Sequence, residues 1–222
     1  GDTTDDTTDD TTDDTVDPVG ADTQSTLDVI HDRGSLKCGI KTSQFGMGYL
    51  DSDTGAYSGL DVEYCRAIAA AIGLNPDSDI EYVVASAGDR FQKLADKEID
   101  VLIRTTTWTT SRDADLNADF AGINFYDGQG ILVNTGAFAD ADSIMDLDGA
   151  NVCTTTGTTT EGNLADYFTT NNLDYTVVGV ANDAAAKIKF VNEECTAWTG
   201  DMSNMVAQQY GVNQDGNASF SM

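Results

Sequence analysis

Two stretches decide the fold of this chain: LKCGI at residues 36–40 and GLDVEYCRAIAAAIG at residues 59–73. The first has the length and composition of a short buried strand. In the second, apolar residues recur at spacings of three and four from Val62 to Ile72, which predicts a helix with one apolar stripe that ends at Gly73. A strand, a loop and a helix in this order begin a unit that builds parallel sheets.

The same alternation continues along the chain on both sides of these stretches. A helix over 26–32, capped by Ser25 and ended by Gly34, comes first, and residues 51–55 read as a tight turn. The next predicted elements are strands over 80–84 and 99–103 and, between them, a helix over 89–97 with Phe91, Leu94 and Ala95 facing inward. This pattern predicts an α/β fold with a parallel sheet and right-handed crossovers.

A second α/β series follows a glycine-containing segment after Asn124, which suits a crossing between two domains. We predict a strand after this segment, strands over 150–155, 175–180 and 196–199, helices over 161–170, 183–192 and 202–209, and a loop over 211–222. The predicted organisation is therefore a linker over 1–24, a first lobe over 25–127 and a second lobe over 128–222.

The charge of the chain excludes several classes of partner. It has 11 Lys and Arg against 38 Asp and Glu, a net charge of −27, so we expect neither nucleic acid nor an anionic membrane surface as a partner. Residues 1–22 hold nine Asp and no Lys or Arg, and we predict that the 1–24 linker is disordered. It is either a solubilising tail or, as we favour, the spacer between a membrane anchor and a binding domain, with a signal peptide already removed.

Four cysteines, at positions 38, 65, 153 and 195, allow three pairings, and their spacing indicates no metal site. Their even number favours disulfides formed outside the cytoplasm, and buried free thiols in a cytosolic protein are the alternative. The single histidine, His31, falls in the first predicted helix, where a solvated residue is expected. The chain has no nucleophile elbow, phosphate loop or zinc-protease motif, so we predict no catalytic residue, no metal and no cofactor.

Three polar groups follow predicted strands, where open α/β sheets bind ligands. The segment 104–113 carries two arginines that can each hold a carboxylate, or can form ordinary surface salt bridges. Thr158 and Glu161 have the spacing of a capping box, so the following helix start can present free amides to an anion or be an ordinary capped helix. Asp201 can accept bonds from an ammonium group, or cap the next helix. Together the three groups complement a zwitterion.

Five ordered runs carry a resemblance to a known family: residues 59–71, 90–94, 100–113, 124–130 and 156–168. They resemble the extracytoplasmic solute-binding proteins of polar amino acid ABC transporters, and most of all the general L-amino acid-binding subgroup. The likeness covers about residues 25–209. It implies a two-lobed fold of the type II periplasmic-binding-protein class that closes on one amino acid by a hinge motion.

The resemblance also implies roles for individual residues. Arg112 resembles the arginine that clamps the ligand α-carboxylate, with Thr107 beside it and Thr105 near the α-amino group. Thr159 resembles a second-lobe threonine that also meets the carboxylate, and Asp201 the aspartate that pairs with the α-ammonium. The side-chain pocket would be shaped by three residues after the first strand, Lys41, Gln44 and Phe45.

The family's pairing of cysteines implies one disulfide in each lobe, Cys38 with Cys65 and Cys153 with Cys195. The implied function is extracytoplasmic binding of L-amino acids, as a periplasmic or extracellular monomer or tethered lipoprotein, for delivery to an ABC transporter permease. An enzyme such as a small dehydratase or lyase, and a sensor domain, are the alternatives on the same scaffold. Relatives continue beyond the strand that carries Asp201, so we expect a C-terminally truncated chain whose second lobe is incomplete.

Overall fold

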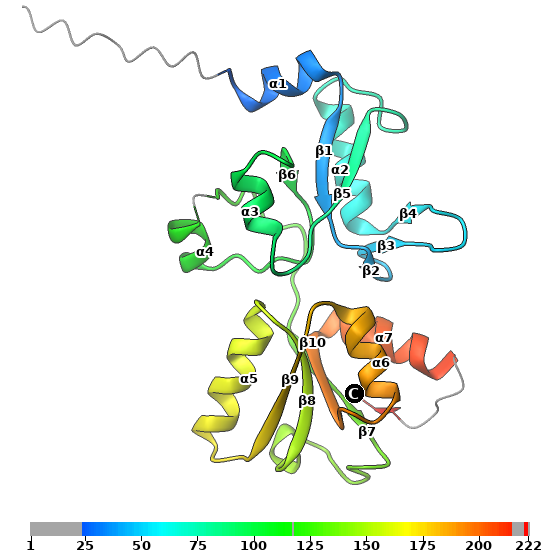
Figure 1. Cartoon of the computed structure of the whole chain (residues 1–222), viewed down its shortest axis with the longest axis vertical. Helices are drawn as coiled ribbons and strands as arrows, with labels where there is room; N and C mark the ends of the chain where they lie inside the picture. The colour runs from blue at the N-terminus through cyan, green and yellow to red at the C-terminus, as the bar shows by residue number, and fades with distance from the viewer. Residues whose placement is uncertain (1–23, 117, 215–219, 222) are drawn as a thin grey trace, which may run out of the picture.

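The computed structural model describes residues 24–116, 118–214 and 220–221, and the predicted disorder of the linker lies outside these residues except at Gln24. The described chain forms two lobes, one above the other in Figure 1, and a single segment near residues 120–128 joins them within the described residues. We keep 127/128 as the proposed boundary between the lobes. No helix in the described ranges has the length and apolar character needed to cross a membrane.

The first lobe is built on a parallel sheet with the strand order β5-β1-β6. Its strands are β1 (Leu36–Ile40), β5 (Ile80–Val84) and β6 (Val101–Leu102), and its helices are α1 (Thr26–Arg33), α2 (Leu60–Ala71), α3 (Arg90–Ala95) and α4 (Thr110–Asp115). A small antiparallel sheet, β2 (Ser43–Gln44), β3 (Gly48–Leu50) and β4 (Tyr57–Ser58), extends from the end of β1. The apolar stripe of α2 packs on β1 and β5 as the spacing predicts, with Val62, Cys65 and Ala69 buried.

The second lobe is a five-stranded mixed sheet with the order β11-β7-β10-β8-β9. The strands are β7 (Gln129–Asn134), β8 (Ala150–Thr155), β9 (Tyr175–Val180), β10 (Ala197–Asp201) and β11 (Phe220–Ser221), and the helices are η1 (Ile144–Asp146), α5 (Thr159–Thr170), α6 (Asp183–Val191) and α7 (Met202–Gln214). One core gathers around Phe190, Trp198 and Met205, and another around Leu164 and Phe168. Helices on both faces therefore bury the sheet, as Figure 1 shows.

Most predicted elements are confirmed within two residues, and several details are wrong. The predicted strand over 99–103 shortens to Val101–Leu102, and on α3 the buried residue is Arg90 while Ala95 is exposed. In the second sheet, β7 runs antiparallel to β10, an orientation that the sequence pattern did not indicate. The predicted loop over 211–222 is also wrong in its described part, because α7 continues to Gln214 and β11 pairs with β7. The expected incompleteness of the second lobe stays a prediction.

Contacts between residues close in sequence explain why the predicted ends of α1 and the predicted turn at 51–55 are confirmed. The Ser25 side chain accepts from the amide of Asp28, and Gly34 takes a left-handed conformation at the other end of α1. In the predicted turn at 51–55, the Asp51 carboxylate accepts from two amides of that turn, of Asp53 and Thr54. These contacts involve neighbours in sequence, which is why the sequence alone predicts them.

Candidate functional site

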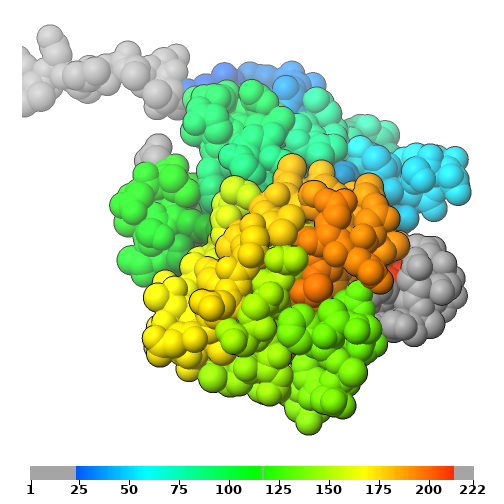
Figure 2. All heavy atoms as spheres, turned by 60° about the horizontal axis from the view of Figure 1, so that its bottom comes forward, coloured from blue at the N-terminus to red at the C-terminus, as the bar shows by residue number. Residues whose placement is uncertain are grey.

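A cavity of about 420 Å³ lies between the two lobes and takes side chains from both. Its volume falls in the range of about 300–1,000 Å³ that is usual for small-ligand sites. In the space-filling view, the yellow and orange surface of the second lobe meets the green and cyan surface of the first (Figure 2). A second cavity of about 390 Å³ shares Arg104, Thr105, Thr107, Thr159, Thr160 and Asp201 with it.

Arg112 lines the first cavity from α4, whose start is capped by the Thr109 side chain. One guanidinium nitrogen of Arg112 donates to the carbonyl oxygen of Thr107 at 2.9 Å. Burial lowers the pKa of Arg112, and the negative charge of Asp201 opposes this change. Thr105 and Thr107 line both cavities, so three of the six predicted first-lobe residues, Thr105, Thr107 and Arg112, line the first cavity together.

Two second-lobe residues line the same space: Asp201 at the end of β10 and Thr159 at the start of α5. Burial raises the pKa of Asp201, with Asp127 and Asp183 adding to the shift and Lys41 and Arg104 opposing it. An ammonium group beside this carboxylate would stabilise its charged form. The hydroxyls of Thr107 and Thr159 lie 3.1 Å apart, so these two residues also join the lobes directly.

The start of α5 forms part of the second-lobe wall through Thr158, Thr159 and Thr160. The Thr158 hydroxyl accepts from the amide of Glu161 at 3.2 Å, as a capping box requires. The Glu161 carboxylate, however, accepts from Gly157, one residue before the cap, rather than from Thr158. The positive end of the helix dipole is therefore next to the cavity, where it favours an anion.

The three residues after β1 lie in different environments. Lys41 lines the cavity, whereas Gln44 and Phe45 do not. Gln44 is fully buried, and its side chain accepts from Lys41 at 2.8 Å and donates to Ser203 at 3.1 Å. Phe45 is 65% exposed and packs edge-on against Tyr49. In this structure Gln44 therefore supports Lys41, and Phe45 takes no part in the cavity wall.

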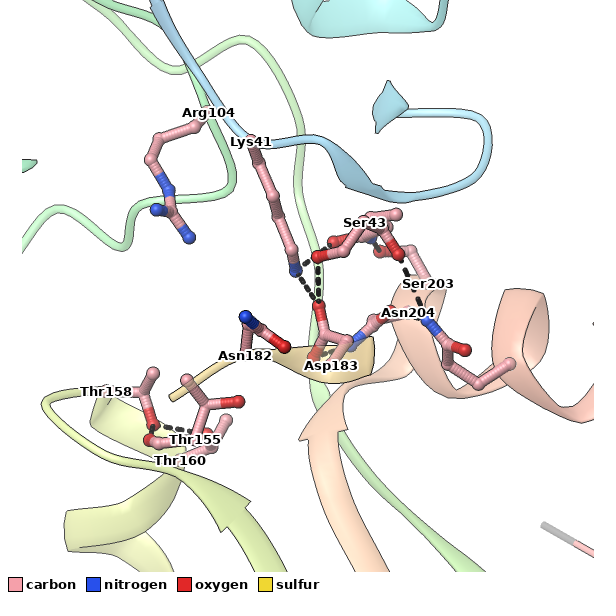
Figure 3. Close-up of polar contacts among 12 residues, drawn as sticks. Lys41, Ser43, Arg104, Thr155, Thr158, Thr160, Asn182, Asp183, Ser203 and Asn204 are labelled. Atoms are coloured by element: carbon pink, nitrogen blue, oxygen red, sulfur yellow. Dashed lines mark hydrogen bonds and ion pairs between the residues drawn. The ribbon is translucent and has the colours of Figure 1, made fainter. Parts of the chain in front are cut away.

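A polar cluster that the sequence analysis missed joins the lobes around Asp183, the first residue of α6. Its carboxylate accepts from Lys41 at 2.5 Å, from Ser43 at 3.2 Å and from Asn204 at 2.9 Å (Figure 3). Gln208 donates both to Asn204 and to the carbonyl oxygen of Ser43. Asp183 follows a strand as Asp201 does, and this placement was the signal that could have identified it.

Two further arginines lie at the cavity: Arg104, one of the two arginines in segment 104–113 that the sequence offered for a carboxylate, and Arg90, which the sequence did not indicate as a ligand residue. Arg90 is 3% exposed and Arg104 partly buried, and both line the first cavity. Next to them, Asp61 lines the second cavity, and burial raises its pKa to about 6 although Arg104 and Lys41 oppose the shift. Within the described ranges, no group of three or more His, Cys, Asp or Glu is placed to hold a metal.

Each lobe has one disulfide, and the pairs are those that the resemblance implies. Cys38 in β1 is bonded to Cys65 in α2, and Cys153 in β8 to Cys195 just before β10. The first ties a helix to the sheet that it covers, and the second ties neighbouring strands at a buried position. Both stabilise the strands whose ends carry the cavity residues.

Comparison with known proteins places this geometry in a family. Residues 36–210 match the family described as bacterial extracellular solute-binding proteins, family 3. The chain belongs to this family. It is 44% identical over 191 residues to the glutamate/glutamine/aspartate/asparagine-binding protein of Rhodobacter capsulatus, an alignment that covers 86% of this chain and 55% of the relative. It is also 39% identical to the general L-amino acid-binding periplasmic protein of Rhizobium johnstonii, covering 84% of this chain and 54% of that one.

Solved structures agree with the two-lobed fold of this solute-binding family. A periplasmic binding protein from Brucella ovis with glutathione bound has a TM-score of 0.81 and 38% identity, covering 89% of this chain and 63% of that chain. An ancestral arginine-binding protein bound to arginine has a TM-score of 0.71 and 26% identity, covering 85% and 78%. The chain spans about half the length of the curated relatives that it matches.

Proposed function

We propose that this chain is the ligand-binding part of an extracytoplasmic receptor that binds L-amino acids for delivery to an ABC transporter permease. The observation that carries the proposal is that Arg112 of the first lobe and Asp201 of the second line the same cavity. An arginine can hold a carboxylate through two parallel hydrogen bonds, and a buried aspartate can pair with an ammonium group. A cationic and an anionic group on the walls of one cleft complement the two charged ends of an amino acid.

Three further findings support this proposal. The relatives of known name bind amino acids, and one of them is named a periplasmic protein. Two disulfides favour an oxidising compartment, which the periplasm and the cell exterior provide. In the same proposal, Thr105, Thr107 and Thr159 supply hydroxyls to the ligand, Lys41 lines the side-chain region, and residues 1–24 tether a monomer to the membrane.

Calorimetry and thermal shift on the 222-residue chain test the proposal. With a panel of the twenty L-amino acids, at least one ligand at 100 times its dissociation constant should stabilise the chain by about 2.7 kcal/mol. Arg112→Ala should remove most of that affinity, whereas Arg66→Ala, on the outer surface of α2, should leave it unchanged. A panel with no stabilising ligand, or affinity of Arg112→Ala within about threefold of the wild type, would contradict the proposal.

An enzyme on the same scaffold is the second candidate, since Asp61 offers a carboxyl group with a raised pKa at the wall of the second cavity. A catalytic acid or base must reach the reacting atoms of its substrate. Proton NMR of a bound amino acid over a day separates the candidates, because a receptor returns its ligand unchanged. A sensor domain would also return it, and co-purification with permease subunits distinguishes the transport receptor from a sensor.

A further inference from the structure

Three arginine side chains of the first lobe meet in the cavity between the lobes. Arg90 comes from the start of α3, Arg104 from the segment after β6, and Arg112 from α4, and all three line the same space. Arg90 and Arg112 both lie against the ring of Phe91, with their guanidinium carbons 4.6 and 5.6 Å from its centre. One aromatic ring therefore packs against two positive charges.

None of these arginines has a carboxylate partner in the described part of the chain. Every hydrogen bond of their guanidinium groups goes to a backbone carbonyl oxygen, namely those of Ala85, Ala87, Thr107 and Gly157. The Nε atoms of Arg90 and Arg104 are shielded from solvent and have no hydrogen-bond partner in the structure. Buried cationic groups are normally paired, because removing a charge from water is costly.

The nearby acidic groups do not balance this positive charge. Asp183 pairs with Lys41 at 2.5 Å, and Asp89 is engaged by Ser86 and Lys93. Arg104 interacts most strongly with the charge of Asp183 and then with those of Asp61, Asp201 and Asp89, but it forms a salt bridge with none of them in the described ranges. Burial lowers the pKa of Arg90 to about 9, and the positive charges of Arg104 and Arg112 lower it further. Suppose that the α-carboxylate and α-ammonium of an amino acid pair with Arg112 and Asp201, and that the charge of Asp61 neutralises that of Arg104. The positive charge of Arg90 then still has no negative charge to neutralise it.

We propose that Arg90 and Arg104 form an anion subsite of this cavity, and that the ligand is an amino acid with a second carboxylate on its side chain. This inference rests on the proposed function, which does not by itself distinguish acidic from neutral amino acids. The ligand's α-carboxylate is held by Arg112, and its side-chain carboxylate receives the free guanidinium donors of Arg90 and Arg104. Charge-assisted bonds of this kind are the strongest that a protein offers to a carboxylate.

The opposite wall is suited to the same group. Thr155, Thr158, Thr160 and Asn182 of the second lobe line the cavity and bring hydroxyl and amide donors. Figure 3 shows Arg104 extending from the first lobe toward these residues, with Asn182 and the threonines on the far side of the space. A carboxylate between them would be bound from both lobes, so this subsite also favours the closed arrangement.

Calorimetry with L-glutamate and L-glutamine on the wild-type chain gives the first test. The two ligands have nearly the same shape and differ in the charge at the end of the side chain, so the ratio of their affinities measures the subsite. We expect glutamate to bind at least about tenfold more tightly than glutamine. Equal binding, or tighter binding of glutamine, would overturn the inference and leave the proposed function standing. Failure of every L-amino acid to bind would overturn both.

Variants of Arg104 provide the second test, with Arg66→Gln as the matched control at a half-buried arginine of α2 that lines neither cavity. Arg104→Gln should weaken glutamate binding about tenfold or more and change glutamine binding by less than about threefold. Retained glutamine binding shows that the variant is folded, and Arg104→Lys should recover part of the affinity for glutamate. An equal loss for both ligands in Arg104→Gln would mean that the residue only supports the fold, and would refute the subsite.

Discussion

The ion pair between Lys41 and Asp183 offers a direct test of how the lobes are held together. Its side chains are only 12% and 7% exposed, and it joins the end of β1 in the first lobe to the start of α6 in the second. Within the described residues the lobes share a single covalent connection, so contacts of this kind decide their relative position. We predict that Asp183→Asn opens the cleft.

The magnitude follows from the burial of the pair. Asparagine has the same shape as aspartate and can still accept from Asn204, but it removes the only carboxylate that forms an ion pair with the Lys41 ammonium in the described residues. Removing one partner of a buried ion pair costs about 3–5 kcal/mol. Because about 1.4 kcal/mol corresponds to a tenfold change, the closed arrangement should lose a factor of more than about 100 relative to an open one. Lys41 regains its hydration when the lobes separate, so opening relieves the cost.

Spin labels in the two lobes measure this change. Genetically encoded labels at the exposed positions Ala67 on α2 and Thr169 on α5 avoid the four disulfide-bonded cysteines. Pulsed electron resonance should show a longer and broader distance distribution in Asp183→Asn than in the wild type. Lys189→Gln is the control, because it breaks an exposed ion pair with Glu194 inside the second lobe and should change nothing. Superimposable distributions for the wild type and Asp183→Asn would refute the reasoning.

Three further predictions concern stability, and urea unfolding measures each of them. The folded pKa of Asp61, about 6, exceeds its ordinary value of 3.8, so the folded chain retains a proton that the unfolded chain loses between these values. Stability should therefore fall by about 2 kcal/mol as the pH rises from 4 to 6. Asp61→Asn should reduce that slope, and the raised pKa of Asp201 should account for part of the remainder; an unchanged slope would contradict the prediction. Replacing Cys153 and Cys195 with Ala should cost about 4 kcal/mol, since their bond closes a 42-residue separation, and a loss below about 1 kcal/mol would contradict this. Gly59 has φ +112°, and a Cβ added there would lie 2.2 Å from a backbone oxygen, so Gly59→Ala should cost about 2 kcal/mol or more. Gly149→Ala is the control, because Gly149 also has a positive φ, +79°, but has open space around it, so this substitution should cost less. Equal costs for the two substitutions would show that the steric clash at Gly59 contributes nothing.

The elements of the fold were predictable wherever the signal is local. The stripe of α2 and the caps of α1 depend on neighbours within four residues, and these predictions are confirmed. The helix α3 shows the limit of the same reasoning. Periodicity assigned Ala95 inward because it is apolar, yet the side chain that is buried there is Arg90, which lies over Phe91 at the cavity. A cation that is buried at a binding cleft breaks the pattern on which such predictions depend.

Site residues could be predicted from the sequence where they follow a predicted strand. The contacts that join the two lobes could not be predicted. Arg112, Asp201 and Lys41 all follow strands, and all three line the cavity. The polar residues of α7, among them Asn204 and Gln208, resemble an ordinary solvated helix face in the sequence. Both are buried because the second lobe brings them against β2, an association between segments more than 150 residues apart. No pattern within one segment carries that information.

Lys41 links the closing of the lobes to the charge of the ligand. It is bonded to Asp183, and its positive charge also lowers the pKa of both Asp61 and Asp201. An ammonium group at Asp201 would therefore meet a carboxylate that Lys41 already stabilises, and the two cations would repel each other. A ligand with a second carboxylate offsets this repulsion, whereas a neutral amino acid does not. The same ion pair that joins the lobes thus disfavours ligands without an additional negative charge, which is why the ratio of glutamate to glutamine affinity is the most informative single measurement on this cleft.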